Sequence, residues 1–159
     1  MPNKNTPFSA VYSCFLDKIT DDMYMELTTQ DTVKMLKNLF LNALHYFEFP
    51  RQDIYDYDET LEEYNIELTS EEINVIATYM IVEWLGQQLA SVENTRMKYS
   101  GSDFKFTSQA NHMGKLQSMK KEYERLGFHL QRLYKRRKKD DEGIMRSTFG
   151  SIMESSFDN

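Results

Sequence analysis

The sequence predicts an all-α fold: a bundle of about four helices with a long C-terminal helix, an acidic inserted loop and an extended C-terminal tail. Proline and glycine are scarce, at three and six of 159 residues, which favours long helices over many short strands. Hydrophobic residues make up 40% and charged residues 28%, the balance of a folded domain with one core. We expect a single helical domain over residues 1–139, with a loop insertion at about 50–68, and a tail over 140–159.

Two helices are expected in the first third of the chain. The first runs from Phe8 to about Met25, where apolar residues recur at helical spacing: Phe8, Val11, Tyr12, Phe15, Leu16 and Ile19. The second begins at Thr28 or Thr29, whose hydroxyls can cap free backbone N–H groups. It ends before Pro50, because the residue preceding a proline avoids helical angles. Its core stripe is expected to be Val33, Leu36, Phe40, Leu44 and Phe47, widened by Leu39 and Ala43.

An acidic loop is expected from Arg51 to Leu68, where helical periodicity is weak. Tyr64, Ile66 and Leu68 alternate with polar residues, which indicates a short strand or extended segment. A connection of this length usually has a function or is mobile. Its acids do not have the spacing of a calcium-binding loop, which needs a central glycine and a later bidentate glutamate. They are instead expected to form a negative surface that is solvated or faces DNA or a neighbour: Asp53, Asp56, Asp58, Glu59, Glu62, Glu63 and Glu67.

The third helix has the clearest start signal in the chain. The segment Thr69-Ser70-Glu71-Glu72 fits a capping box, with Thr69 as the cap and Glu72 reaching back to it. Apolar residues then follow on nearly every side up to Leu89, so this helix is expected to be central and buried. Gly86 lies inside it and marks a possible close approach of another helix.

The last helix is expected from Ser108 or Ala110 to Lys139, after a break over Arg96 to Gln109 in which Phe104 and Phe106 suggest a short extended piece. At 1.5 Å per residue it would span roughly 45 Å and project beyond the bundle. Its apolar residues form a heptad-like seam: Leu116, Met119, Tyr123, Leu126, Leu130 and Leu133. The tail that follows carries scattered large apolar residues and is either a docking peptide or a frayed end.

Charge is strongly separated along the chain, although the net charge is only -6. From Glu48 to Glu72 there are ten acidic residues and one basic residue, whereas from Lys115 to Lys139 there are ten basic and two acidic residues. One interpretation is two solvated faces. The other is that oppositely charged surfaces of identical copies meet head to tail, a contact that can close into a ring.

Patterns for chemistry are mostly missing from the sequence. His45, His112 and His129 are not spaced as metal ligands, and the single cysteine, Cys14, has no local activating group. No phosphate-binding glycine loop occurs. We therefore expect no catalytic residue, no metal site and no cofactor, and we expect the protein not to be an enzyme. No stretch is long and apolar enough to predict a membrane span.

Three strings carry a resemblance to a known family. They are Thr69-Ser70-Glu71-Glu72-Ile73, MKYSGSDFKFTSQANHM from Met97 to Met113, and FHLQRLYKRR from Phe128 to Arg137. With the order of the helices, they make the region from Phe8 to Gly150 resemble the small helical head–tail connector (neck adaptor) proteins of tailed bacteriophages. The resemblance implies a virion protein, assembled in the cytoplasm of the bacterial host, that forms a ring of usually twelve copies beneath the portal.

The resemblance also implies partners. The ring would bind the portal protein on one side and tail or other neck proteins on the other, with packaged DNA passing through its lumen without sequence reading and with no membrane involved. The acidic loop would face the lumen or the neighbouring subunit. The C-terminal region would dock on the portal, with these candidate residues: Leu133, Tyr134, Lys135, Arg136, Arg137, Lys138, Lys139, Phe149, Ile152 and Phe157.

The basic run Lys135 to Lys139 supports an alternative function. Five consecutive cations at the end of a helix complement its dipole, but they could also contact phosphates without reading sequence, and Tyr134 could stack on a base or pack against a neighbour. The chain would then be a non-enzymatic DNA-binding or packaging accessory protein. The acidic net charge counts against this alternative. Contact with an acidic protein surface, or a solvated helix end, remains open as well.

Overall fold

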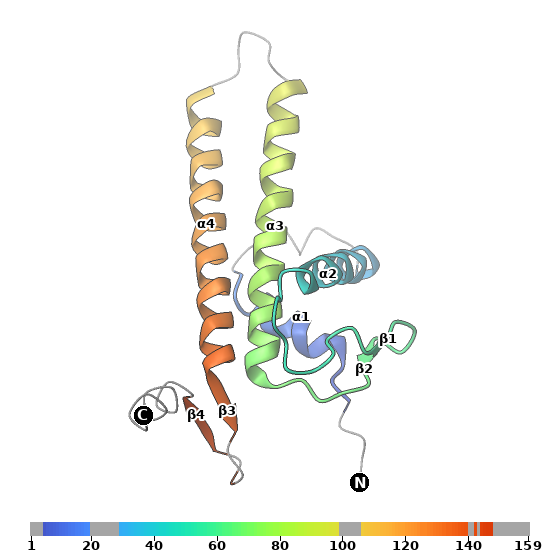
Figure 1. The fold of residues 1–159 in the computed structure, drawn as a ribbon. Coiled ribbons are helices and arrows are strands. Elements are labelled where there is room, and N and C mark those ends of the chain that lie inside the picture. The colour runs from blue at the N-terminus through green and yellow to red at the C-terminus, as the bar shows by residue number, and fades with distance from the viewer. Residues whose placement is uncertain (1–4, 20–28, 99–105, 140–141, 143, 148–159) are drawn as a thin grey trace, which may run out of the picture.

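Two long antiparallel helices stand side by side in the computed structural model, and the shorter elements gather around one end of the pair (Figure 1). The structure describes residues 5–19, 29–98, 106–139, 142 and 144–147. The long pair is α3 (Ser70–Lys98) and α4 (Phe106–Arg136), and two shorter helices, α1 (Phe8–Leu16) and α2 (Thr29–Leu44), pack against α3. The predicted all-α fold with a long C-terminal helix is therefore confirmed for the described part of the chain.

Helix α1 is shorter than expected, because it ends at Leu16 rather than near Met25. Its buried residues are Phe8, Val11, Tyr12 and Phe15, so the helix ends just after its apolar face does. The backbone then leaves the α-helical pattern: the N–H of Lys18 donates to the carbonyl of Phe15, three residues back. The expected continuation from residue 20 to Met25 lies outside the described residues.

Helix α2 begins at Thr29 and ends at Leu44, which fits the expected start and the expected end before Pro50. Its buried face is Leu36, Leu39, Phe40, Ala43 and Leu44. Val33 was expected on this face, but it lies one turn before the first buried residue and stays 40% exposed. Phe47 is buried as expected, although it follows the helix in a turn.

An aromatic cluster joins α1 and α2 to the acidic segment. The ring of Phe8 lies 4.6 Å from the ring of Phe40 and 5.6 Å from that of Tyr64, measured between centroids. Tyr12 and Tyr57 meet the same rings edge to face. Such contacts add stability beyond simple burial, so the acidic segment is anchored in the core rather than added to its surface.

The expected acidic loop contains a short β-hairpin. Strand β1 (Tyr57–Asp58) pairs with β2 (Glu63–Tyr64) in antiparallel register. The N-terminal segment joins them, because the N–H of Tyr64 donates to the carbonyl of Thr6 and the N–H of Thr6 donates to the carbonyl of Ile66. The short extended segment predicted near Tyr64 is confirmed in part, and both of its partners, β1 and the segment at Thr6, precede it in the sequence.

Helix α3 begins with the predicted capping box. The N–H of Thr69 donates to Oε2 of Glu72 at 2.7 Å, and the N–H of Glu72 donates to the hydroxyl of Thr69 at 3.3 Å. From Val75 to Leu85 nearly every side chain is buried, whereas after Gly86 the helix leaves the other elements and is covered mainly by α4. None of the described helices combines the length and apolar character of a membrane span.

Helix α4 differs from the expectation at both ends and along its seam. It runs from Phe106 to Arg136, so Phe106 is helical and the basic run leaves the helix before Lys139. The residues of α4 that pack on the core are Leu116, Tyr123, Leu130 and Tyr134. Met119 and Leu126, also expected in the seam, are exposed. Gly127 and Tyr134 face α3, so α4 is rotated about its axis relative to the predicted seam. One half of the heptad pattern, which includes Met119 and Leu126, therefore lies at the side of the helix contact.

The chain after α4 turns back on itself. Strand β3 (Arg137–Lys139) pairs with β4 (Met145–Ser147), and Arg137 lies opposite Ser147. The first part of the expected extended tail is therefore a hairpin at the foot of α4. The candidate docking residues Phe149, Ile152 and Phe157 lie outside the described residues.

Among Gly86, Gly114 and Gly127, the tightest contact with a neighbouring helix is at Gly127, and not at Gly86 as expected. A Cβ atom built on Gly127 would lie 2.7 Å from Cζ of Tyr79, whereas one on Gly86 would meet Cε of Lys120 at 3.6 Å, an ordinary contact. We expect Gly127→Ala to lower the free energy of unfolding, because the overpacking cost of about 1–3 kcal/mol outweighs the gain of about 1 kcal/mol from replacing a helical glycine. Urea denaturation measures the change.

The matched control is Gly114→Ala in the same helix. A Cβ atom there would meet nothing within 4 Å, so this variant should be more stable than the wild type by up to about 1 kcal/mol. Equal stability changes in the two variants would contradict the close contact between Gly127 and Tyr79.

Candidate functional site

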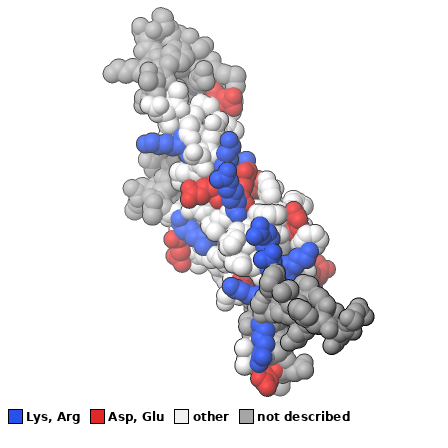
Figure 2. All heavy atoms as spheres, turned by 60° about the vertical axis from the view of Figure 1, so that its left-hand side comes forward, with Lys and Arg blue, Asp and Glu red and all other residues white. Residues whose placement is uncertain are grey.

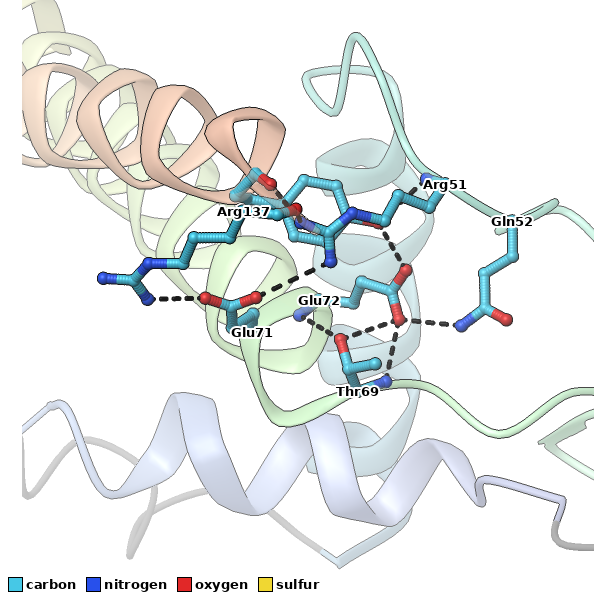
Figure 3. Close-up of polar contacts among 7 residues, drawn as sticks. Arg51, Gln52, Thr69, Glu71, Glu72 and Arg137 are labelled. Atoms are coloured by element: carbon cyan, nitrogen blue, oxygen red, sulfur yellow. Dashed lines mark hydrogen bonds and ion pairs between the residues drawn. The ribbon is translucent and has the colours of Figure 1, made fainter. Parts of the chain in front are cut away.

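The densest group of polar side chains lies at the foot of the α3–α4 pair, where three segments far apart in sequence meet. Figure 3 shows it, with residues from the segment after α2, from the start of α3 and from the end of α4. We call it the base cluster: Arg51, Gln52, Thr69, Glu71, Glu72, Tyr134 and Arg137. It joins the acidic region of the sequence to the basic one.

Glu72 is the centre of the base cluster. Its side chain is buried, and its Oε2 accepts hydrogen bonds from the N–H and the hydroxyl of Thr69 and from the amide of Gln52, at 2.7, 2.9 and 2.7 Å. Its Oε1 accepts a hydrogen bond from the hydroxyl of Tyr134 at 2.6 Å. Four donors match the acceptor capacity of a carboxylate, so the hydrogen-bonding capacity of this side chain is filled from within the chain.

Arg51 closes the C-terminal end of α4. Its Nη2 donates to the carbonyl oxygens of Tyr134 and Arg137, and its guanidinium carbon lies 3.9 Å from the centroid of the Tyr134 ring. The last carbonyls of a helix have no partner within the helix. Arg51 supplies donors and positive charge there, which explains why α4 ends at Arg136.

Glu71 holds two arginines at the same corner. Its Oε1 accepts a hydrogen bond from Nη1 of Arg137 at 2.7 Å, and its Oε2 lies 3.7 Å from Nη1 of Arg51. Both arginines are partly exposed, so each pair is screened by water and contributes little by itself. Together the contacts fix where the basic segment begins.

Tyr134 is a core residue, which corrects the expectation that it contacts a base or a partner. It is 1% exposed, and its hydroxyl accepts a hydrogen bond from the N–H of Arg51 at 2.8 Å while donating to Glu72. Burial, and then the hydrogen bond to Glu72, raise the pKa of this phenol above its ordinary value. The side chain is directed into the chain because its hydroxyl completes the Glu72 network.

A second polar group, which we call the Gln131 clamp, fixes the segment after α2 to both long helices. The amide nitrogen of Gln131 donates to the hydroxyl of Tyr79 at 2.7 Å and to the carbonyl of Tyr46 at 2.9 Å. Its amide oxygen accepts from the N–H of Glu48 at 2.9 Å. The rings of Tyr46 and Tyr79 stack with centroids 5.1 Å apart. The position of the next aromatic residue, Phe49, is set by this clamp.

The structure divides the predicted basic residues. Leu133 is half-buried, Lys135 and Arg136 are exposed on the last turn of α4, and Arg137 pairs with Glu71. Lys138 and Lys139 continue along β3. The ammonium of Lys135 lies 4.4 Å from the centroid of the Phe49 ring, a cation–π contact. The run is thus not a uniform positive patch.

The predicted acidic residues have mostly local roles. Oδ1 of Asp53 accepts the N–H of Tyr55, and Oδ1 of Asp58 accepts the N–H groups of Thr60 and Leu61. Such bonds are what aspartate contributes to turns. The remaining predicted acids also lie on or beside the hairpin. Asp56 accepts from Asn65, and Glu63 accepts from Asn5. Glu59 lies 3.9 Å from Lys37, and the carbonyl of Glu62 accepts the N–H of Phe8. Glu67 is exposed and accepts through its carbonyl from Gln52.

The acidic and basic stretches of the sequence do not form two fully separate charged faces in the structure. Part of it is neutralised inside the chain, where Glu71 meets Arg51 and Arg137. Figure 2, turned toward the α4 side, shows Lys and Arg side chains interspersed with Asp and Glu. Exposed cations predominate on the outer surface of α4, where Glu122 is the single exposed acid among the helix residues whose burial is described. The exposed cations are Lys115, Lys121, Arg125, Arg132, Lys135 and Arg136.

The polar groups of the base cluster and the Gln131 clamp hold separate segments of the chain together. Among the described residues, no three His, Cys, Asp or Glu side chains are grouped to hold a metal ion. The sequence indicated neither the partners of Arg51 and Gln131 nor the exposed Phe49 and Phe128. Arg51 had one available signal, because it is the single cation in an acidic stretch. The contacts of Gln131 and the exposure of Phe49 and Phe128 depend on the orientation of a helix or a turn, which the sequence does not indicate.

The same substitution at two buried tyrosines should have opposite effects. Tyr134→Phe leaves Glu72 without one donor and the Arg51 N–H without its acceptor, so we expect a loss of about 1–3 kcal/mol in the free energy of unfolding. The hydroxyl of Tyr64 is buried and has no hydrogen-bond partner among the described residues. Tyr64→Phe should therefore be neutral or more stable by up to about 1 kcal/mol. Equal losses in urea denaturation would contradict the assigned network.

Tyr46 should ionise late. Its hydroxyl donates to Glu83 at 2.6 Å, and this hydrogen bond, with burial and nearby charge, raises its pKa to about 12 from 10.0. The neutral phenol is thus favoured in the folded state. Its contribution to stability is present below pH 10 and is lost as the pH rises to about 12.

Nuclear magnetic resonance of ring-labelled tyrosine can follow this titration, with Tyr46→Phe identifying the signal. In Glu83→Gln the carboxylate acceptor is gone, so the midpoint should move down toward the ordinary value. An unchanged midpoint in that variant would contradict the role of Glu83.

Comparison with known proteins adds no relative to this geometry: no protein-family model, no curated protein and no solved structure matches the chain. The resemblance to phage connectors stays a prediction made from the sequence. The function is therefore inferred from the described residues themselves, from what the base cluster holds in place and from what it leaves exposed.

Proposed function

We propose that this chain is a non-enzymatic structural subunit of a phage neck: copies form a ring, of twelve by the family resemblance, that joins the portal to the tail. Packaged DNA would pass through the lumen of this ring without being read. The observation that carries the proposal is that buried and exposed side chains have different roles. The buried polar groups fix the helices to one another, whereas large apolar and aromatic groups stay on the surface.

The exposed apolar and aromatic groups are spread over the surface. Nine large apolar or aromatic side chains are exposed among the described residues, and they lie on several different elements. Scattered apolar residues are normal on a surface, but protein–protein contacts are enriched in aromatic residues and arginine, which Phe128 and Arg132 combine at 5.8 Å. They are Val33, Tyr46, Phe49, Tyr55, Leu61, Met119, Leu126, Phe128 and Ile144.

The shape fits an assembly subunit as well. Beyond Gly86 the α3–α4 pair extends away from α1, α2 and the β1–β2 hairpin (Figure 1). A pair of helices with only each other for cover buries one side of each helix. Such an arm is suited to contact other subunits, and the base cluster fixes the opposite end of the same helix pair.

The alternative of DNA binding has less support. Arg137 is paired with Glu71, and Lys135 lies against the Phe49 ring, so part of the basic run contacts the chain itself. Duplex DNA binding that weakens steeply with added salt would favour this alternative.

The test of the proposed function uses the portal protein encoded in the same genome. Mixing the two proteins should give a complex whose mass corresponds to a ring of this chain on the portal, seen as annular particles by electron microscopy. We expect a variant with Phe149→Ser, Ile152→Ser and Phe157→Ser to fold but not to bind, because apolar anchors carry most of the energy of such contacts.

Val33→Ser is the matched control, since it replaces an exposed apolar residue by serine on a helix that is not part of the predicted docking region. It should bind the portal like the wild type. A wild-type chain that forms no complex with the portal would overturn the proposed function.

A further inference from the structure

The tip of the β1–β2 hairpin presents an apolar knob surrounded by acids. Leu61 is 67% exposed, more than any other large apolar side chain among the described residues. It is held in place, because Oδ1 of Asp58 accepts its N–H at 3.0 Å and that of Thr60 at 2.7 Å. Glu62 follows in the left-handed region with φ 52°. Glu59 lies two residues before the leucine and Glu62 one residue after it, and the Glu59 side chain is 57% exposed although its carboxylate lies 3.9 Å from Lys37. The hairpin tip therefore combines one apolar side chain with nearby negative charge.

The position of this knob is fixed by the core below it. The carbonyl of Glu62 accepts the N–H of Phe8 at 2.8 Å, at the start of α1. A non-glycine residue in the left-handed region costs free energy and persists where surrounding contacts hold it. The leucine therefore stays at the tip because the turn geometry is anchored to α1, and it does not fold back onto its own chain.

A surface of matching chemistry lies on α4 and on the segment beside it, and we call it the socket: Phe49, Phe128, Arg132 and Lys135. Phe49 is 58% and Phe128 is 52% exposed. Lys135 lies 4.4 Å from the centroid of the Phe49 ring, and Arg132 lies 5.8 Å from that of Phe128. Phe128 and Lys135 are seven residues apart, so they share one face of the helix.

The socket is also preorganised. The Gln131 clamp binds the backbone of Tyr46 and Glu48, directly before Phe49, and the base cluster fixes the end of α4. Two exposed aromatic rings, each with one cation beside it, form the kind of surface that binds an apolar group accompanied by carboxylates. Binding there has a low ordering cost, because the rings are already in position.

The knob and the socket of one chain cannot meet. In Figure 1 the β1–β2 hairpin and α4 lie on opposite sides of α3. A contact between two different patches of identical copies is heterologous, and it continues from copy to copy until a ring closes. Opposite charges on the two patches would steer this approach and fix its direction.

We propose that the Leu61 knob of one copy docks between Phe49 and Phe128 of the next copy, with Glu59 and Glu62 facing Arg132 and Lys135. This inference rests on the proposed ring function and names the contact that builds the ring. A second copy is favoured over DNA as the occupant, because an exposed leucine on an acidic turn complements the aromatic rings as well as the cations, and phosphate would use only the cations.

The test exploits the direction of the contact. Leu61→Ser removes the knob and keeps the socket, whereas Phe128→Ser removes part of the socket and keeps the knob. In sedimentation velocity of the full chain at high concentration, each variant should self-associate about tenfold or more weakly than the wild type. An equal mixture of the two should form dimers and stop there, because each pair retains one intact knob and one intact socket.

Leu126→Ser is the matched control, since it changes another exposed apolar residue of α4 outside the socket. It should assemble like the wild type. Assembly lost in Leu126→Ser but kept in Leu61→Ser would move the interface to the flank of α4 and overturn the proposal. A mixture of Leu61→Ser and Phe128→Ser that stays monomeric would also overturn the proposal.

A cross-linking experiment tests the same contact if it is too weak to be seen by sedimentation. With Cys14→Ser in both chains, Leu61→Cys mixed with Phe128→Cys should give a disulfide-linked dimer under mild oxidation, faster than Leu61→Cys mixed with Leu126→Cys. Equal rates would contradict the proposal.

Portal binding by wild-type chains that show neither self-association nor this cross-link would overturn the knob and socket while leaving the proposed function standing. If Lys135→Glu abolished duplex DNA binding while Leu61→Ser assembled normally, the socket would be a DNA surface.

Discussion

A buried carboxylate governs how this chain is put together. Moving a charge out of water is expensive, and it is tolerated only where hydrogen bonds replace the lost hydration. Glu72 receives those bonds from its own helix cap, from the segment after α2 and from the far end of α4. The donors come from positions 52, 69 and 134, so the carboxylate is satisfied only when all three segments have reached their places. The Glu72 network thereby sets the register of α4 along α3.

The aromatic cluster and the Gln131 clamp extend this constraint to the rest of the molecule. Phe8 and Tyr64 attach the β1–β2 hairpin to α1, while the clamp ties Tyr46 and Tyr79 to α4. The hairpin tip and the outer face of α4 are therefore parts of one body. Surface groups on such a body keep a fixed separation and orientation, which is what a subunit with two different contact patches requires.

Local features of this fold were predictable from the sequence, whereas contacts between distant segments were not. The capping box at Thr69 and Glu72 lies within four residues, so its sequence pattern is sufficient. The end of α4 depends on Arg51, whose contact with Tyr134 joins positions 83 residues apart. A glycine in a helix signals a possible close approach, but the rotation of α4 decides that Gly127 and not Gly86 meets a ring. For the same reason the heptad pattern predicted α4 but misplaced half of its seam.

The two kinds of charge in the chain should respond differently to solution conditions. The carboxylate of Glu72 is buried among donors, where added salt has little access, whereas Glu59, Arg132 and Lys135 are exposed and are screened within about 8 Å at physiological ionic strength. Salt therefore weakens contacts made by the outer charges before it affects the fold. The exposed leucine and phenylalanines do not depend on charge, and their burial is driven by the release of water. A surface that combines both is guided by charge at long range and held by apolar contact at short range, so its strength and its direction have separate physical origins.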